Sequence, residues 1–188
     1  MTTRKGKNIN TYMGVEFYPL DPRKEEVKIE DIAHALSMMC RGNGHVKFFF
    51  TVGQHSVNCA KEAAARGYSI RVQLACLLHD ASEAYMSDVT RPVKAALSEY
   101  LVMEEKLQTF IYESFGLADI SKEEQDQIDS VDDTMLAEEM KALFTVVPDH
   151  VLAKDYTVAY EGLEVAVEEI PAVKAAFLDL FEELSSKL

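Results

Sequence analysis

The chain has few glycines, few prolines and no long apolar run. Its 188 residues include 8 Gly and 5 Pro, a scarcity that favours helices over a turn-rich β fold. No apolar stretch approaches the ~18–20 residues of a membrane-spanning helix, so we expect no membrane partner. The first residues, Met1 to Lys7, lack the apolar core of a signal peptide, which predicts a cytoplasmic protein.

Basic residues and cysteines are also scarce. There are 19 Lys and Arg against 32 Asp and Glu, a formal net charge of −13. Such a surface repels the phosphates of duplex nucleic acid, but it leaves room for one cationic pocket that binds a small phosphorylated ligand. The three cysteines, Cys40, Cys59 and Cys76, stand far apart and form no C-x-x-C pair. They predict buried, reduced thiols rather than a disulfide framework or a zinc knuckle.

Apolar spacing and capping residues predict a single all-α domain over residues 1–188. Apolar residues recur at three- and four-residue intervals, and Thr51 with Gln54 forms the pattern of a capping box. The predicted helices span residues 30–41, 52–66, 70–85, 91–115 (as one helix or two), 121–144 and 171–188. We expect a short strand or hairpin within 12–23 and irregular structure over 148–160.

The domain divides into a motif-bearing core over about residues 29–144 and a C-terminal helical extension over about 171–188. The extension has an apolar stripe that we expect to pack on the chain's own core. Packing of this stripe against a second copy, as a homodimer, is the alternative. The stripe consists of Val173, Phe177, Leu180, Phe181 and Leu184.

The predicted helix 70–85 is apolar on nearly every side, yet it contains His79, Asp80 and Glu83. An unpaired carboxylate in a core costs several kcal/mol, so something must offset its charge. A bound cation does so most directly, because carboxylates and neutral imidazoles are good metal ligands. An internal salt bridge or a capped helix end is the structural alternative.

Two further residues complete a candidate metal site. His55 lies in the first turn of the helix predicted over 52–66, where a buried structural histidine is the alternative interpretation. Asp132 lies on the apolar stripe of the helix 121–144, so its carboxylate should face inward. Asp133 falls toward the edge of that stripe and should face water.

The ordered series of His55, His79-Asp80 and Asp132 resembles the motif of the HD-domain metal-dependent phosphohydrolases. The resemblance extends over most of the chain, from about residue 29 to 143. It is carried by IAHAL (32–36), R-x-x-GH (41–45), TVGQHSV (51–57), LLHDASEAY (77–85), DVTRPVK (88–94) and D-x-x-x-LA-x-E (132–139). This chain is similar to a subgroup of bacterial 5′-deoxynucleotidases and of phage enzymes that hydrolyse deoxyadenosine triphosphate.

The resemblance implies an HD-domain helical bundle that removes phosphate from a (deoxy)nucleoside 5′-monophosphate by attack of a metal-activated water. Its metal ligands would be His55, His79, Asp80 and Asp132. One divalent ion of Mn, Co, Fe or Zn suits imidazole with carboxylate better than Mg does.

The same resemblance suggests acid/base and substrate-binding residues. Glu83, one turn after His79 on the same helix face, would act on the attacking water. Asp88 would be a second acid/base group, with a helix N-cap as the alternative. Arg41, His45 and Lys94 would bind the phosphorylated substrate, whereas Arg91 is expected to be a surface charge.

Other functions remain open at this point. One is triphosphohydrolase activity on a deoxynucleoside triphosphate, and another is a non-catalytic metal- or nucleotide-sensing module. A His-rich two-metal site is disfavoured, because no histidine lies between His79 and Asp132. The Glu-Asp pair of the alarmone hydrolases is missing after Asp80. Gln54 also departs from the subgroup, whose members usually have Glu before the first metal-binding histidine.

Overall fold

The computed structural model describes residues 4–153 and 156–188 and contains helices with one small hairpin. The strands are β1 (Ile9–Asn10) and β2 (Glu16–Phe17), and the short 3₁₀ helices are η1 (Lys24–Glu26) and η2 (Arg41–Gly44). The α-helices are α1 (Ile29–Met38), α2 (Val52–Ala65), α3 (Ile70–Leu78), α4 (Glu83–Met86), α5 (Arg91–Lys94), α6 (Ser98–Ser114), α7 (Lys122–Leu143), α8 (Asp149–Leu152) and α9 (Ile170–Ser185). The prediction of an all-α fold with a short N-terminal hairpin is confirmed.

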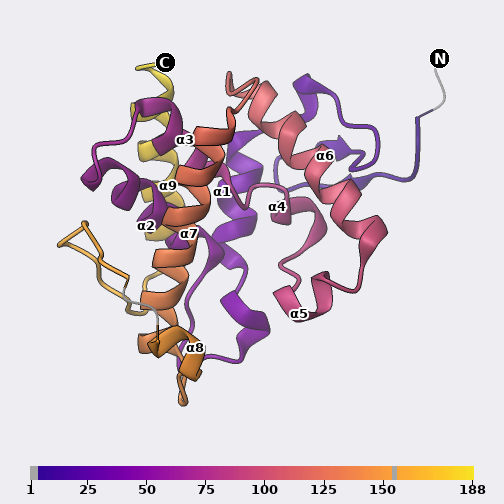
Figure 1. Cartoon of the computed structure of the whole chain (residues 1–188). Coiled ribbons are helices and arrows are strands. Elements are labelled where there is room, and N and C mark those ends of the chain that lie inside the picture. The colour runs from indigo at the N-terminus through magenta and orange to yellow at the C-terminus, as the bar shows by residue number, and fades with distance from the viewer. Residues whose placement is uncertain (1–3, 154–155) are drawn as a thin grey trace.

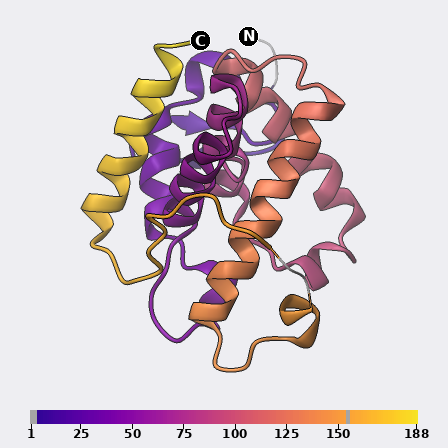
Figure 2. The same ribbon diagram turned by 60° about the vertical axis from the view of Figure 1, so that its left-hand side comes forward.

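The core forms where α1, α2, α3, α7 and α9 pack together. Helix α2 contacts the other four, and α3 also contacts α7 and α9. Figure 2 shows α7 and α9 on opposite sides of α2 and α3, whereas Figure 1 shows α4, α5 and α6 on the side away from α9. Val173, Phe177 and Leu184 of α9 are buried, so the C-terminal stripe packs on the chain's own core as predicted.

Capping residues begin two of the core helices, α2 and α7, as the sequence predicts. Thr51 and Gln54 form a reciprocal capping box at the start of α2, and Ser121 and Glu124 form another at the start of α7. Gly67 follows α2 with φ of 73°, a left-handed conformation that glycine adopts without strain. These caps fix where His55 and Asp132 lie along their helices.

The predicted continuous helix over 70–85 is wrong. Helix α3 ends at Leu78, and a turn over residues 79–82 precedes the short α4. The side chain of Gln108, on α6, lies between two groups that a continuous helix would pair with each other. Its Nε2 donates to the carbonyl oxygen of Leu78 at 2.7 Å, and its Oε1 accepts from the N–H of Ser82 at 3.0 Å. The amide therefore satisfies both ends of the break.

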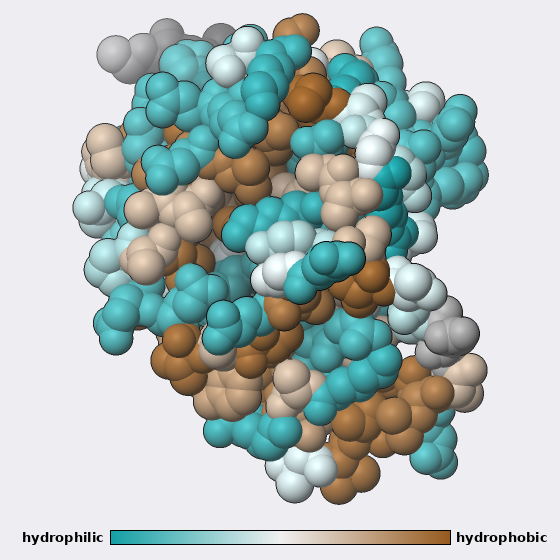
Figure 3. Space-filling model, turned by 90° about the vertical axis from the view of Figure 1, so that its left-hand side faces the viewer, coloured by the Kyte–Doolittle hydropathy of each residue, from teal (hydrophilic) through white to brown (hydrophobic). Residues whose placement is uncertain are grey.

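Smaller differences lie near the two ends of the chain. The hairpin joins β1 to β2, so its first strand lies before the predicted 12–23 segment. The segment 148–160, predicted as irregular, contains the short α8, while residues 154–155 and the His150 side chain lie outside the described structure. Apolar atoms gather at the lower end of the face in Figure 3, the end at which Figure 1 places α8. The exposed apolar residues there include Val146 and Leu152.

Within the described parts of the chain, every helix is too short or too polar to cross a membrane.

Candidate metal centre and substrate cavity

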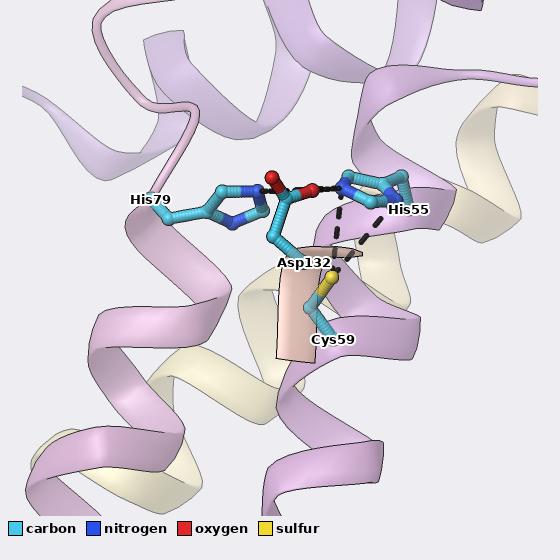
Figure 4. Close-up of side chains that lie close together, drawn as sticks. All are labelled: His55, Cys59, His79 and Asp132. Atoms are coloured by element: carbon cyan, nitrogen blue, oxygen red, sulfur yellow. Dashed lines mark hydrogen bonds and ion pairs between the residues drawn. The ribbon is translucent and has the colours of Figure 1, made fainter. Parts of the chain in front are cut away.

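The four residues predicted to bind metal lie together. His55 projects from α2 and Asp132 from α7, while His79 and Asp80 directly follow α3. His55 Nε2 lies 3.1 Å from Asp132 Oδ1 and 3.3 Å from His79 Nε2. Asp80 Oδ2 lies 3.4 Å from His79 Nε2 and 4.0 Å from His55 Nε2. Figure 4 shows the two imidazoles on either side of the Asp132 carboxylate.

Hydrogen bonds on the far side of each ring determine which nitrogen faces the cluster. His55 Nδ1 lies 2.9 Å from Glu139 Oε2, and His79 Nδ1 lies 2.8 Å from the carbonyl oxygen of Cys76. Carboxylate and carbonyl oxygens only accept, so each Nδ1 carries a hydrogen and donates it. In a neutral imidazole the remaining Nε2 is then a bare acceptor. Two such acceptors facing two carboxylates need a shared cation or additional protons.

The spacing of these atoms fits one bound ion. Donor atoms about 2.1 Å from a common ion lie about 3.0 Å apart when adjacent and about 4.2 Å apart when opposite. The measured separations, from 3.1 to 4.0 Å, fall within that range. The cluster could therefore hold a metal ion.

Among the described residues, His55, Cys59, His79 and Asp132 each offer a ligand atom, and these atoms all lie within 4.8 Å of one another; this group includes Cys59 and does not include Asp80. The sequence alone assigns Cys59 no role here, although its position four residues after His55 places both on one face of α2. Its Sγ lies 3.5 Å from His55 Nε2 and 3.9 Å from His55 Nδ1. Such similar distances place the sulfur over the ring rather than in line with the Nε2 lone pair. Burial raises the pKa of the Cys59 thiol well above its ordinary value, so the thiol packs here in its neutral form.

The carboxylates strongly favour protonation of both imidazoles when no metal is bound. Burial lowers the pKa of His79, but the charges of Asp80 and Asp132 outweigh burial and raise it to about 9. The pKa of His55 is raised as well, because Glu139 and Asp132 outweigh burial and a nearby arginine. Burial opposes ionisation of Asp132, yet its hydrogen bonds with His55 and His79 lower its pKa well below the ordinary value. Protons thus take the place that a cation would fill.

Glu139 and Arg41 are charged residues that contact the predicted metal ligands. Glu139 is 1% exposed, and its Oε1 has no hydrogen-bond partner among the described residues. Arg41 Nη1 lies 3.3 Å from Asp80 Oδ2, and Arg41 Nε lies 4.0 Å from Glu139 Oε2. The Arg41 guanidinium therefore partly balances both carboxylates.

Glu83 lies beside the cluster, but not for the predicted reason. It does not share a helix face with His79, because the turn over 79–82 separates them. Glu83 is 4% exposed, and its Oε2 has no hydrogen-bond partner in the described chain. Burial first, and then the charges of Asp80 and Asp88, raise its pKa to about 9.

A cavity of about 450 Å³ opens beside these residues, between η2, the segment 88–94 and the C-terminal half of α7. The predicted site residues on its wall are Arg41, His45, Asp80, Glu83, Asp88, Lys94 and Asp132. Another part of the wall is apolar and includes Val46, Leu136, Met140, Leu143 and Phe144. The cavity therefore joins a charged region to an apolar region.

The substrate-binding candidates occupy different parts of this wall. Lys94 Nζ bonds to Glu104 Oε1 at 2.8 Å and lies 3.7 Å from Glu83 Oε1. His45 is exposed, at the end of η2. The alternative interpretation of Asp88 as a helix N-cap is wrong, because Thr90 occupies the N-cap position of α5.

Arg91 is exposed, as the sequence predicts, but it also contacts the site. Its Nη2 lies 2.7 Å from Asp132 Oδ2, and its Nη1 lies 3.1 Å from Asp133 Oδ1. Arg91 also lines the 450 Å³ cavity. Asp133 is partly exposed, as predicted, but it faces this arginine as well as water. Sequence spacing could not find these contacts, because they join helices about 40 residues apart.

A second cavity, of about 320 Å³, lies on the α6 side of the same turn. It shares Asp80, Glu83 and Lys94 with the larger cavity and adds His79, Glu104 and other residues of α6. The turn that carries His79 and Asp80 is therefore reached from two sides.

The comparisons with known proteins give relatives but no function. No model of a known protein family matches the chain. The chain is 38% identical over 109 residues to the uncharacterized protein YfdR of Escherichia coli (strain K12), a match that covers 58% of each protein. It is 33% identical over 168 residues to the uncharacterized protein RCAP_rcc00048 of Rhodobacter capsulatus, covering 84% of this chain and 85% of that protein. The chain belongs to the family of this Rhodobacter protein.

Gln54, which directly precedes His55, makes hydrogen bonds that a glutamate could not make. Gln54 Oε1 accepts from the N–H of Thr51 at 3.0 Å, as a glutamate would. Its Nε2 donates to the carbonyl oxygen of Ala166 at 3.0 Å and to Glu168 Oε1 at 3.1 Å. A carboxylate could not donate these two bonds. The amide thus ties the segment before α9 to the helix that carries His55.

Proposed function

We propose that the protein is an HD-type, metal-dependent phosphohydrolase that removes phosphate from a (deoxy)nucleoside 5′-monophosphate. One observation supports this most strongly: the Nε2 atoms of two imidazoles converge with the carboxylates of Asp80 and Asp132, and these two carboxylates lie on the wall of a 450 Å³ cavity. Metal ligands with an open approach for a small molecule are typical of hydrolytic metal sites.

His55, His79, Asp80 and Asp132 would hold the ion. This nitrogen and oxygen donor set favours Mn, Co, Fe or Zn over Mg, which prefers oxygen ligands alone. When bound, the ion would supply a hydroxide-like nucleophile near neutral pH and polarise the phosphoryl group. Glu139 and the Cys76 carbonyl, by accepting from Nδ1 of each ring, hold both Nε2 atoms toward the ion.

Glu83 and Asp88 would move protons during hydrolysis. The water oxygen forms a bond to phosphorus while the bond from phosphorus to the sugar oxygen breaks. With a cation bound beside Asp80, Glu83 would ionise despite its raised pKa and accept the proton that the water loses, since its unpartnered Oε2 lies in the wall shared by both cavities. Asp88, on the same wall, would deliver a proton to the departing sugar oxygen.

Arg41, His45 and Lys94 would bind the phosphate, and the apolar wall would hold the base. A guanidinium offers a two-bond fork to phosphate oxygens. A nucleobase has flat, largely apolar faces that suit the wall beside Leu136 and Phe144. The cavity volume lies within the range of about 300–1,000 Å³ that is usual for small-molecule sites.

The charges around the cavity favour a monophosphate over a triphosphate. Among the described residues, the wall carries three cationic side chains (Arg41, Arg91, Lys94) and five carboxylates (Asp80, Glu83, Asp88, Asp132, Glu139). With a divalent ion bound, these charges would balance. A triphosphate has more negative charge than a monophosphate and would meet no additional cations there.

Location and assembly are part of the proposal. The cysteines are free thiols, with Cys59 and Cys76 buried, which suits the reducing cytoplasm where nucleotides occur. Association into a homodimer stays a prediction.

Phosphate release from a panel of nucleotides tests the proposal. The panel contains mono-, di- and triphosphates, ribo and deoxy, with Mn²⁺, Co²⁺, Zn²⁺ and Mg²⁺ in turn and Asp80→Ala as the inactive control. We expect release from monophosphates, faster with a transition metal than with Mg²⁺, and none from the control. Preferred hydrolysis of triphosphates would indicate the triphosphohydrolase instead. Nucleotide binding without release under any metal would indicate a sensor.

A further inference from the structure

Arg91, at the start of α5, binds two adjacent aspartates of α7. One guanidinium nitrogen binds Asp132 Oδ2 at 2.7 Å, and the other binds Asp133 Oδ1 at 3.1 Å. The opposite oxygen of Asp132, Oδ1, faces His55 Nε2 and lies 3.7 Å from His79 Nε2. Arg91 therefore binds the one oxygen of Asp132 that does not face the imidazoles.

We propose that Arg91 is a positioning residue that fixes the orientation of the Asp132 carboxylate for metal binding, with Asp133 holding the guanidinium in place. This inference rests on the metal site of the proposed function, and it does not depend on which substrate is hydrolysed.

The geometry gives Arg91 this role because a carboxylate turns freely about its last torsion unless both oxygens are held. The planar guanidinium presents two nitrogens in a fixed arrangement, so that one can bind Asp132 while the other binds Asp133. Partners of this kind behind a metal ligand typically contribute about 10–100-fold to metal affinity.

The contact has little to do with stability of the fold. The Arg91 side chain is 62% exposed, and none of the residues of α5 is buried. Exposed ion pairs of this kind typically contribute little to folding stability. An exchange at Arg91 should therefore leave the core intact and act on the orientation of Asp132.

Arg91→Lys is the most informative variant, because it keeps the positive charge and loses the fork. Asp133→Ala removes the second hydrogen-bond partner of the Arg91 guanidinium and leaves Asp132 unchanged. Arg71→Lys is the matched control, because Arg71 Nε binds Glu124 Oε1 of α7 at 2.8 Å, far along the helix from Asp132.

The experiment titrates Co²⁺ into chelator-treated protein and measures the Kd by calorimetry together with the visible absorption of the bound ion. We expect Arg91→Lys to weaken binding by roughly 10–100-fold and to shift the Co²⁺ bands, with unchanged melting of the metal-free protein. Asp133→Ala should weaken binding less, and Arg71→Lys should bind like the wild type.

Three results would overturn the proposal. Wild-type Kd and spectrum in Arg91→Lys would show that the fork does not orient Asp132. Slower nucleotide turnover at an unchanged Kd would make Arg91 a substrate contact instead. If the wild type binds no Co²⁺, the metal site and this inference fail together. If Arg91→Lys weakens metal binding while no nucleotide is hydrolysed, the inference stands and the proposed activity fails.

Discussion

Helix α2 carries two buried polar groups about two turns apart, Glu62 and His55, in opposite circumstances. Glu62 is fully buried, yet both its oxygens accept hydrogen bonds. The donors are Arg66 Nε at 2.7 Å, the N–H of Ala159 at 3.0 and 3.1 Å, and the N–H of Tyr160 at 2.8 Å. His55 instead turns its Nε2 toward a second imidazole and the carboxylates of Asp132 and Asp80.

This comparison distinguishes a buried charge that stabilises the fold from buried groups that are available to bind a cation or substrate. Around Glu62 each acceptor has a donor, so the carboxylate fastens a distant segment to α2. Around His55 the acceptors outnumber the donors, and two neighbouring carboxylates, Glu83 and Glu139, each keep one oxygen without a partner among the described residues. Leaving buried acceptors unpaired costs free energy that a bound cation or substrate would recover.

The largest expected effect is on catalysis by Glu83. Glu83→Gln keeps the size of the side chain but removes its ability to take a proton. We expect turnover of the preferred nucleotide to fall by roughly 10²–10⁴-fold, with metal content unchanged. Steady-state kinetics combined with elemental analysis checks this. Loss of the metal would make Glu83 a ligand, and near-normal turnover would transfer its role to Asp88.

Two matched substitutions, one that acts on His55 and one at Glu62, should have different effects on metal affinity and on stability. Glu139→Gln weakens the bond to His55 Nδ1, so we expect metal affinity to fall by about 10–100-fold. Glu62→Gln leaves donors of Arg66 and Tyr160 poorly satisfied, so it should lower the free energy of unfolding by about 1–3 kcal/mol at unchanged metal affinity. Metal titration and urea unfolding of both variants measure the two effects. If each variant changed both quantities equally, the distinction between the regions would be lost.

Stability of the metal-free protein should depend on pH in a definite direction. The folded pKa of His79, about 9, lies above its ordinary value of about 6.5, so protonated His79 stabilises the fold fully below pH ~6.5. That contribution is lost as the pH rises through about 9. Glu83, with its pKa also raised to about 9, acts in the same direction.

Melting temperatures of chelator-treated protein should therefore fall between pH 6.5 and pH 9, as thermal scans across this range can measure. The stabilisation from added Mn²⁺ should grow over the same range, because metal and protons compete for the same Nε2 atoms. A metal-free melting temperature that rises toward pH 9 would contradict the assigned charges.

Local signals in the sequence predict much of this fold. A hydroxyl at Thr51 or Ser121 with an amide or carboxylate three residues later places the start of a helix, since capping depends only on neighbours. Helical periodicity then turns Asp132 inward, because one face of α7 packs on the core. The sequence could thus place His55 and Asp132 on their helices, with both side chains toward the core.

Contacts between distant helices explain what the sequence could not predict. The break after Leu78 depends on the amide of Gln108, 30 residues away, entering between two backbone groups. Arg91 looks like a solvated charge until its guanidinium reaches Asp132 and Asp133 of α7.

One measurement tests the metal centre most directly. Chelator-treated wild-type protein and Asp80→Ala are each loaded with Co²⁺, freed of excess ion and assayed for metal by elemental analysis, with circular dichroism to verify the fold. We predict one ion per wild-type chain, none in Asp80→Ala, and a higher melting temperature only in the loaded wild type. A folded wild type without bound metal, or full occupancy in Asp80→Ala, would contradict the account.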